Sequence, residues 1–343
     1  MTPIKYWLRF PTLKDPRIPV AGILFSYIVL GMAVLGFNRS PLQMITTVAT
    51  AVALDMLFHR LLVDDDAPLF PLSAMITGMS LSILIDYSHG YLLATIPPLF
   101  AIASKYLVTY RGRHVYNPTL FGAVASLLLM DGMISASPSY LWDGRLYAIA
   151  AFVITMALFF FTLRIKRIVL ILSFLVFYGI SLLIRAWLTH GQVSMTTWMT
   201  GALTAPAFYL FTFFIITDSR TSPDTRSGQV LLALGIVLID AGLRLKQGFF
   251  TFFFAAFLCA TLQLAWLHGR ALIEGLEAFA IRARFGLQRW ATLGLGGCLL
   301  WLAVQMFASV NQGAEPDATQ IAAKQQGIVG AAPDGFARTK ISE

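Results

Sequence analysis

The stretch Ile216–Gly228, ITDSRTSPDTRSG, places two aspartates, two arginines and a proline among hydroxyl side chains. Apolar and aromatic segments precede and follow it, although only 12% of the residues in this 343-residue chain are charged. Backbone groups that a membrane helix leaves free need partners other than lipid, and a polar stretch supplies them. The stretch therefore indicates a loop between two membrane segments, and its unusual polarity indicates a candidate site.

The composition excludes a soluble domain with one core. Hydrophobic residues make up 57% of the chain and the mean hydropathy is +0.73, which predicts a polytopic membrane protein. The two cysteines, Cys259 and Cys298, lie far apart in apolar runs, so this chain cannot build a disulfide framework or a thiolate cluster. The net charge of +8 comes from basic residues in short loops, where they set topology, and we expect no nucleic-acid partner.

Eleven apolar segments have lengths suited to membrane helices or half-helices. They are 19–37, 42–58, 71–85, 91–110, 118–130, 146–163, 168–184, 199–216, 230–243, 249–267 and 290–310. The N-terminal stretch lacks a small-residue cleavage site after a short apolar region, so we expect no removable signal peptide.

The distribution of Lys and Arg predicts the orientation, because cytoplasmic loops hold the excess. With the N-terminus inside, 17 of the 25 basic residues fall in inner loops, five in outer loops and three in the C-terminal tail. The expected organisation is a cytoplasmic segment over 1–18, a transmembrane domain over 19–267, a cytoplasmic amphipathic segment over 268–289, a transmembrane helix over 290–310 and a flexible outer tail over 311–343.

Three of these segments are conspicuously short. They begin at Pro71, Pro118 and Val230. The second and third follow polar loops, HVYNPTLFG (His114–Gly122) and TSPDTRSGQ (Thr221–Gln229). Short, proline-interrupted segments at comparable places in two halves are typical of discontinuous helices, whose free backbone groups line a cavity or a ligand. Asn117, Ser222 or Thr225 could instead act only as helix caps, and the sequence leaves both interpretations open.

The two loops resemble motifs of a known family. HVYNPTLFG resembles the H-(I/V)-F-N-P-A stretch of the RnfD/NqrB family, and TDSRTSPDTRSGQ resembles its TDPVTSP-x-T-x-x-G stretch. The resemblance covers most of residues 19–267, and a branch associated with enediyne biosynthesis clusters, called UnbU, is also similar. It implies an all-α membrane protein with about ten helices in two related halves, to which this chain adds a C-terminal span. It also implies a subunit of a flavin-dependent, ion-translocating electron-transport complex in the bacterial cytoplasmic membrane, with other membrane and redox subunits as partners.

The family carries FMN on a threonine within a stretch resembling D-G-(I/V)-S-(G/Q)-A-T-P. DGMISASP (Asp131–Pro138) can be aligned with this pattern, and Ser137 stands where the threonine would be. The resemblance therefore implies FMN attached through a phosphodiester at Ser137, whereas Ile134 and Ser135 depart from the pattern and an ordinary polar outer loop is the alternative. A noncovalent riboflavin or FMN is the other possibility. The motif residues that would contact it are Asn117, Pro118, Asp218, Arg220, Thr221, Ser222 and Pro223.

Ionisable residues within membrane segments are costly and are therefore candidates for an ion or proton path. Asp55 and His59 lie four residues apart on the second segment and share a helix face, and Asp240 lies towards the outer end of the ninth. A pair that anchors the helix end explains Asp55 and His59 equally well. The adjacent aspartates Asp64–Asp66 indicate a solvated loop, and no metal site is expected.

Together these features predict a membrane subunit that passes electrons through a flavin, with coupled movement of Na⁺ or H⁺. The protein would position the flavin and tune it, and no residue of this chain is expected to act as a catalytic group. The alternative is a transporter, or an export or scaffold protein, on the same fold without flavin.

Overall fold

The computed structural model of the protein describes residues 11–12, 14–15, 17–33, 40–63, 70–87, 91–110, 113–130, 133–136, 167–188, 194–196, 206–244 and 251–275. Most of these residues are helical, as the sequence predicts. The predicted segments 146–163 and 290–310 lie outside the described residues, as do Ser137 and the tail over 311–343.

The helices follow the predicted order of apolar segments. They are α1 (Arg17–Ala33), α2 (Pro41–Leu62), α3 (Leu72–Leu84), α4 (Ile96–Leu107), α5 (Pro118–Leu129), α7 (Ile168–Leu188), α9 (Pro206–Leu210), α10 (Arg226–Arg244) and α11 (Thr251–Gly275). A 3-10 turn, η1 (Leu92–Thr95), leads into α4, and a π-helical turn, η2 (Phe211–Ile215), continues α9. The described parts of the segments 91–110 and 199–216 therefore combine two helix types each.

Two of the helix boundaries that differ from the expected ones change the interpretation of the sequence. α10 begins at Arg226 and has 19 residues, so the prediction of a short segment from Val230 is wrong. Its first turn has the polar sequence RSGQ, which hydropathy alone assigns to the preceding loop. α11 has 25 residues and continues into the stretch from residue 268 that we expected to lie on the membrane surface. Among the described residues, four helices are long and apolar enough to cross a membrane, namely α2, α7, α10 and the first 20 residues of α11.

Two short antiparallel ribbons accompany the helices and were not expected from the sequence. β1 (Ile85–Tyr87) pairs with β4 (Ile134–Ala136), and Ile85 lies opposite Ala136. β2 (Thr109–Tyr110) pairs with β3 (Arg113–His114), and Thr109 lies opposite His114. Strands of two or three residues are too short to show an alternating apolar pattern, so the sequence carries no signal for them.

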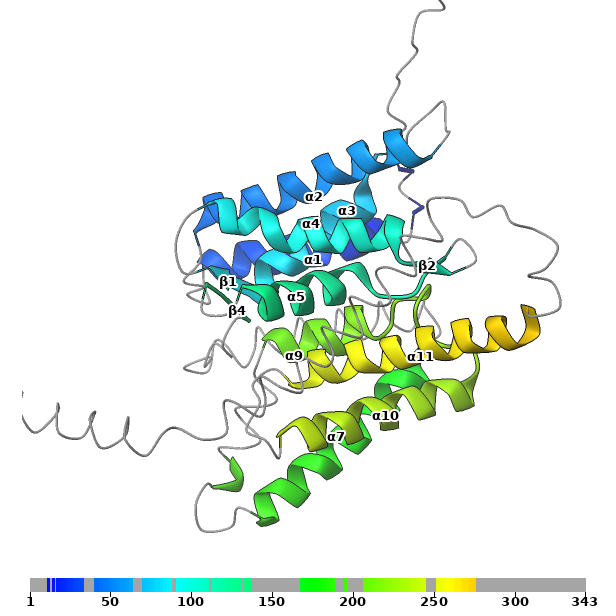
Figure 1. The fold of residues 1–343 in the computed structure, drawn as a ribbon. Helices are drawn as coiled ribbons and strands as arrows, with labels where there is room; N and C mark the ends of the chain where they lie inside the picture. The colour runs from blue at the N-terminus through cyan, green and yellow to red at the C-terminus, as the bar shows by residue number, and fades with distance from the viewer. Residues whose placement is uncertain are drawn as a thin grey trace, which may run out of the picture.

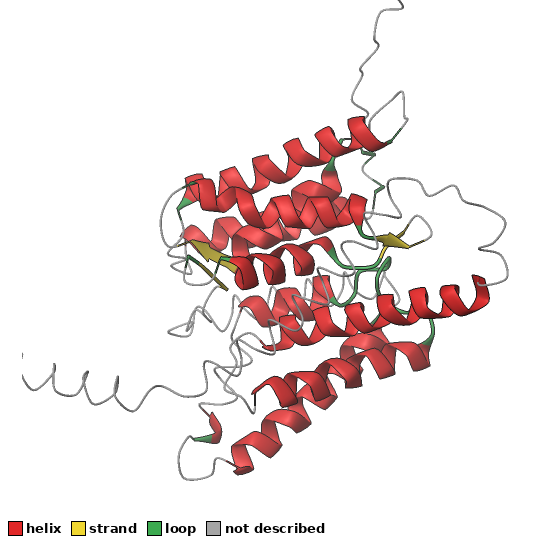
Figure 2. Cartoon of the chain, viewed as in Figure 1, coloured by secondary structure: helices red, strands yellow, loops and turns green. Residues whose placement is uncertain are grey.

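The ribbons mark the two ends of the helix bundle (Figure 2). We call the end with the β2–β3 hairpin and the loops 115–117 and 217–225 the motif end. We call the end with the β1–β4 ribbon the ribbon end. α5 begins at the motif end, directly after Asn117, and ends beside β4 at the ribbon end (Figure 1).

The helices form two packed groups that meet along a seam (Figure 1). In the first group α3 packs against α1 and α2, and α4 packs against α2 and α5. In the second group α10 packs against α7 and α11. The groups meet where α5 contacts α11 and where α3 contacts α9. Aromatic rings fill this seam: Tyr116 and Phe121 lie 5.1 and 5.8 Å from Phe257, measured between ring centroids.

Two glycines allow close helix contacts in the first group. A Cβ atom at Gly122 on α5 would lie 2.5 Å from the carbonyl oxygen of Pro97 on α4. A Cβ atom at Gly78 on α3 would lie 2.7 Å from the Cα atom of Val48 on α2. Small residues at such contacts let membrane helices approach and pack without a hydrophobic driving force.

Apolar side chains remain exposed along one face of the outer helices. On α7 they recur every three or four residues at Leu172, Val176, Ile180, Leu183 and Trp187. A soluble protein would bury such a stripe, whereas a membrane protein presents it to lipid. The fold and this surface therefore define a helical membrane protein.

Candidate functional site

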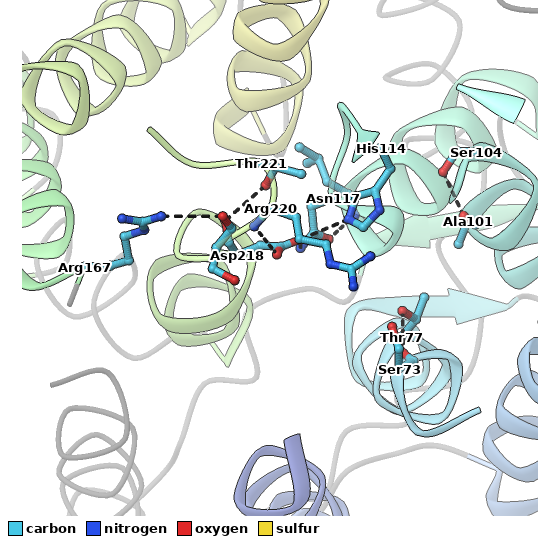
Figure 3. Close-up of polar contacts among 12 residues, drawn as sticks. Ser73, Thr77, Ala101, Ser104, His114, Asn117, Arg167, Asp218, Arg220 and Thr221 are labelled. Atoms are coloured by element: carbon cyan, nitrogen blue, oxygen red, sulfur yellow. Dashed lines mark hydrogen bonds and ion pairs between the residues drawn. The ribbon is translucent and has the colours of Figure 1, made fainter. Parts of the chain in front are cut away.

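The two motif loops meet at the motif end through Asn117 and Asp218, which are 101 residues apart in the chain. The Asn117 side-chain nitrogen donates a hydrogen bond of 3.2 Å to a carboxylate oxygen of Asp218. The Asn117 side-chain oxygen accepts a hydrogen bond from the backbone N–H of Leu120, so the predicted cap of α5 is confirmed. One side chain thus caps a helix and bridges two loops (Figure 3).

Asp218 organises the loop around it. Its second carboxylate oxygen accepts a hydrogen bond from the backbone N–H of Arg220 at 3.0 Å, and its backbone carbonyl accepts from Thr221 and Ser222. The His114 Nε2 atom lies 3.8 Å from the carboxylate. Arg220 contributes its backbone to this arrangement, and its side chain is exposed (Figure 3). The carboxylate of Asp218 is therefore held by groups from both motifs.

Arg167, immediately before α7, fastens the same loop from the other side (Figure 3). Its Nε atom donates to the Ser222 hydroxyl at 2.9 Å, and its Nη2 atom donates to Asp224 at 2.6 Å and to the Ser219 carbonyl at 3.5 Å. The Arg167 and Ser222 side chains are buried, so the bond between them is shielded from water, whereas the Asp224 side chain is 82% exposed. Ser222 therefore serves as a partner of Arg167, and not as the helix cap that was one of its predicted roles.

Two further side chains complete the loop. The Thr225 hydroxyl accepts a hydrogen bond from the backbone N–H of Gly228, which confirms Thr225 as the cap of α10. The amide of Gln229 accepts a bond from the Leu170 backbone N–H and donates one to the Pro223 carbonyl, each at 3.2 Å. The sequence does not mark Arg167 and Gln229 as site residues. Each is a polar residue at the edge of an apolar segment, where membrane topology and solvation are sufficient reasons for a polar side chain.

A small pocket of about 40 Å³ lies beneath the motif loops, between α5, α10 and α11. Its polar lining residues are Asn117, Thr221 and Gln263, and the rest of its lining is apolar. Ligand pockets usually enclose roughly 300 Å³ or more, so this space has room for a few waters and not for a three-ring flavin. The described residues here therefore do not fit a bound isoalloxazine.

Tyr116 lies beside this pocket and links the two helix groups through contacts with α11. Its hydroxyl shares a hydrogen bond of 2.8 Å with the Thr261 hydroxyl on α11. Burial raises the pKa of Tyr116 to about 12, so the phenol stays protonated at physiological pH.

The residues predicted to contact a flavin do not gather at one place. Asn117, Pro118 and the loop over 218–223 lie at the motif end. Ser137 is outside the described residues, but the strand β4, which ends one residue before it, lies at the ribbon end. The 12 residues of α5 separate these ends by roughly 18 Å at the usual helical rise. The motif loops and β4 therefore lie at different ends of α5.

Two of the three candidates for an ion path, Asp55 and Asp240, lie in ion pairs. Asp55 on α2 accepts hydrogen bonds from Lys105 and Tyr106 of α4, so these two partners of its carboxylate come from another helix. Asp240 on α10 accepts bonds from Arg185, Arg244 and Thr251. The sequence could not predict these partners, because helix-face spacing shows only neighbours within one helix.

No group of three or more metal-ligating side chains occurs among the described residues. No family model matches this chain. No curated protein matches it significantly.

Proposed function

We propose that this chain is a divergent RnfD/NqrB-type membrane subunit of an electron-transport complex, similar also to the UnbU-like branch, that works with other membrane and redox subunits. The observation that supports this proposal is the Asn117–Asp218 hydrogen bond, which joins the two motifs that carry the resemblance. Chance similarity of two loops 101 residues apart gives no reason for them to meet. A shared fold gives such a reason. The proposed function includes a coupled movement of Na⁺ or H⁺.

We further propose that the motif end faces the cytoplasm of a bacterial cell, with the N-terminus inside and the C-terminus outside. Among the described basic residues, Arg60, Lys105, Arg113, Arg167, Arg220, Arg226 and Arg270 lie near the motif end, whereas Arg185 and Arg244 lie near the ribbon end. Cytoplasmic loops hold such an excess of positive charge.

Exposed tryptophans fit a bilayer between the two ends. Trp187 near the ribbon end of α7 is 75% exposed, and Trp266 towards the motif end of α11 is 70% exposed. Tryptophan side chains favour the two membrane–water interfaces. The lipid core would then lie between these two side chains.

A flavin is the least supported part of the proposal. The pocket at the motif end is too small for an isoalloxazine, as described above, so we assign no step of a mechanism to a flavin there. Ser137, the proposed position of a covalent FMN, lies outside the described residues.

A second candidate function is a transporter, or an export or scaffold protein, that keeps the fold without flavin. Two observations favour it. The pocket beneath the motif loops has a volume of about 40 Å³, and the Asp218 carboxylate is already bonded by protein groups from both loops. A site that is satisfied internally has less need of a bound ligand.

Purification with colour detection separates these candidates. The protein is purified in detergent, its visible absorbance is recorded, and the flavin is sought in acid extracts and as in-gel fluorescence of the denatured chain. The electron-transport proposal expects flavin bound to the wild type, and covalent attachment expects gel fluorescence that Ser137→Ala abolishes and that the neighbouring control Ser139→Ala retains. Flavin in the acid extract alone identifies a noncovalent site. A colourless, well-folded protein contradicts the electron-transport proposal and supports the flavin-free alternative.

A further inference from the structure

Two buried ion pairs join parallel helices, one pair in each helix group. In the first group, the Nζ atom of Lys105 lies 2.7 Å from the Asp55 carboxylate, and the Tyr106 hydroxyl donates to the same oxygen at 2.9 Å. The Asp55 side chain is 8% exposed and the Lys105 side chain 18%. A buried carboxylate thus carries one positive charge and one neutral donor beside it.

In the second group, the acidic residue lies on the second helix of the pair, as Asp240 on α10, and the basic residue lies on the first, as Arg185 on α7. In the first group the order is the reverse, with Asp55 on α2 and Lys105 on α4. The Arg185 Nη2 atom on α7 donates to the Asp240 carboxylate at 2.8 Å, and the Nε atom of Arg244, one turn along α10, lies 3.1 Å from both oxygens. The Thr251 hydroxyl at the start of α11 donates a further bond. The Asp240 side chain is 1% exposed.

The two ion pairs take equivalent places in the chain. Asp55 and Lys105 are 50 residues apart on α2 and α4, with α3 between them in sequence. Arg185 and Asp240 are 55 residues apart on α7 and α10, with α9 and η2 between them. In each pair of helices, both charged residues lie within the last turns.

A neutral hydrogen bond pins each helix pair near its other end. The Thr47 hydroxyl, near the start of α2, lies 3.2 Å from the carbonyl oxygen of Ala94, in the η1 turn before α4. In the second group the Gln229 amide accepts from the Leu170 backbone N–H, near the starts of α10 and α7. The helices of each pair are therefore parallel and fastened twice.

The two helix pairs run in opposite directions through the bundle. α4 ends at the β2–β3 hairpin, so the Asp55–Lys105 pair lies near the motif end. α7 and α10 begin at the motif end, where Arg167 binds Asp224, so the Arg185–Asp240 pair lies near the ribbon end. The Asp55–Lys105 and Arg185–Asp240 pairs therefore lie at opposite ends of the bundle.

We infer that these ion pairs are matched helix clamps, one for each helix group, and that Asp55 and Asp240 fix the packing of their own group and do not pass a coupling ion. A carboxylate on a cation path must exist for part of each cycle without its cation. A carboxylate clamped by lysine or arginine keeps its partner, because removing either one leaves an uncompensated buried charge. The inference is independent of whether the protein binds a flavin.

Charge-exchange variants test the clamps. Thermal unfolding in detergent is measured for Asp55→Asn, Lys105→Met, the neutral double variant and the exchanged variant Asp55→Lys/Lys105→Asp. The clamp predicts that each single variant lowers the melting temperature by about 5 °C or more, and that each double variant loses less than half of the summed single losses. Combining Asp55→Asn with Arg185→Met, which lie in different clamps, is the matched control and should give additive losses.

The opposite pattern would overturn the inference. A carboxylate on a cation path tolerates Asp55→Asn without loss of stability, because asparagine resembles the protonated acid, and charge exchange gives no rescue. If the single variants fail to fold, the fraction of monodisperse protein on size exclusion is compared instead. Recovery of that fraction in the exchanged variant upholds the clamp, and no recovery contradicts it.

Discussion

Replacement of Asn117 separates its two roles, the cap of α5 and the bridge to Asp218. In Asn117→Ala both are lost. Loss of a cap costs about 1 kcal/mol of the free energy of unfolding. Loss of a hydrogen bond to a charged group costs about 1.5–3 kcal/mol, and the lower part of this range applies because the Asp218 side chain is 20% exposed and water can replace the donor. We therefore expect Asn117→Ala to lower the free energy of unfolding by about 2–3 kcal/mol.

Asn117→Ser isolates the bridge. Serine caps a helix almost as well as asparagine, but its shorter side chain does not reach Asp218, so we expect a loss of about 1.5 kcal/mol. Thr225→Ala is the matched control for capping alone, because Thr225 caps α10 through Gly228, and its expected loss is about 1 kcal/mol.

Equilibrium unfolding of the purified protein in mixed detergent micelles, followed by tryptophan fluorescence, measures these differences. The reasoning fails if Asn117→Ala lies within about 0.5 kcal/mol of the wild type, the usual range of surface substitutions. It also fails in part if Asn117→Ser is indistinguishable from wild type, because the bridge would then contribute nothing. A serine variant as unstable as the alanine variant would instead show that the helix cap contributes nothing to the free energy of unfolding.

Two other substitutions test the packing and the loop. Gly122→Ala should destabilise the protein by about 1–3 kcal/mol, because its methyl group would lie 2.5 Å from the Pro97 carbonyl oxygen. Gly179→Ala, with nothing within 4 Å of the added methyl group, is the control and should stabilise the protein slightly. A shift of the melting temperature of the same sign in both variants would contradict the close packing at Gly122. Arg167→Met should expose the loop over 219–224 and speed tryptic cleavage after Arg220, because it removes the hydrogen bond to Ser222. Lys14→Met is the control and should leave the cleavage rate unchanged. Equal rates in both variants would show that Arg167 does not hold the loop.

Local chemistry explains which features of this fold were predictable from the sequence. Asn117 before Pro118 and Thr225 before the RSGQ turn are ordinary capping signals, and the structure has caps at both. The apolar segments predicted the helices, because burial in lipid selects long apolar runs. Hydropathy does not predict the start of α10, because its first turn is polar. The Thr225 cap stabilises that turn.

The choice of tertiary partners could not be predicted. Asp55 has a plausible neighbour at His59 on its own helix, yet the bundle brings Lys105 of α4 within 2.7 Å of it. Arg167 was counted only as a topological charge, although it is the buried anchor of the motif loop. The separation of β4 from the motif loops follows from the direction of α5, which a sequence pattern does not disclose. These contacts depend on which helices pack together, and one sequence contains no direct record of that.

Cross-linking between the two motif loops tests the central claim most directly. Cysteines replace Asn117 and Asp218 in a Cys259→Ser/Cys298→Ser background, and a short bifunctional methanethiosulfonate is applied in native membranes. The control pair places cysteines at Met133 and Asp218, because Met133 follows α5 beside β4 at the ribbon end and Asp218 lies at the motif end. We predict efficient cross-linking of the first pair, detected by mobility after cleavage between the loops, and none of the control. No cross-link between positions 117 and 218, or equal yields from both pairs, would contradict a shared site at the motif end.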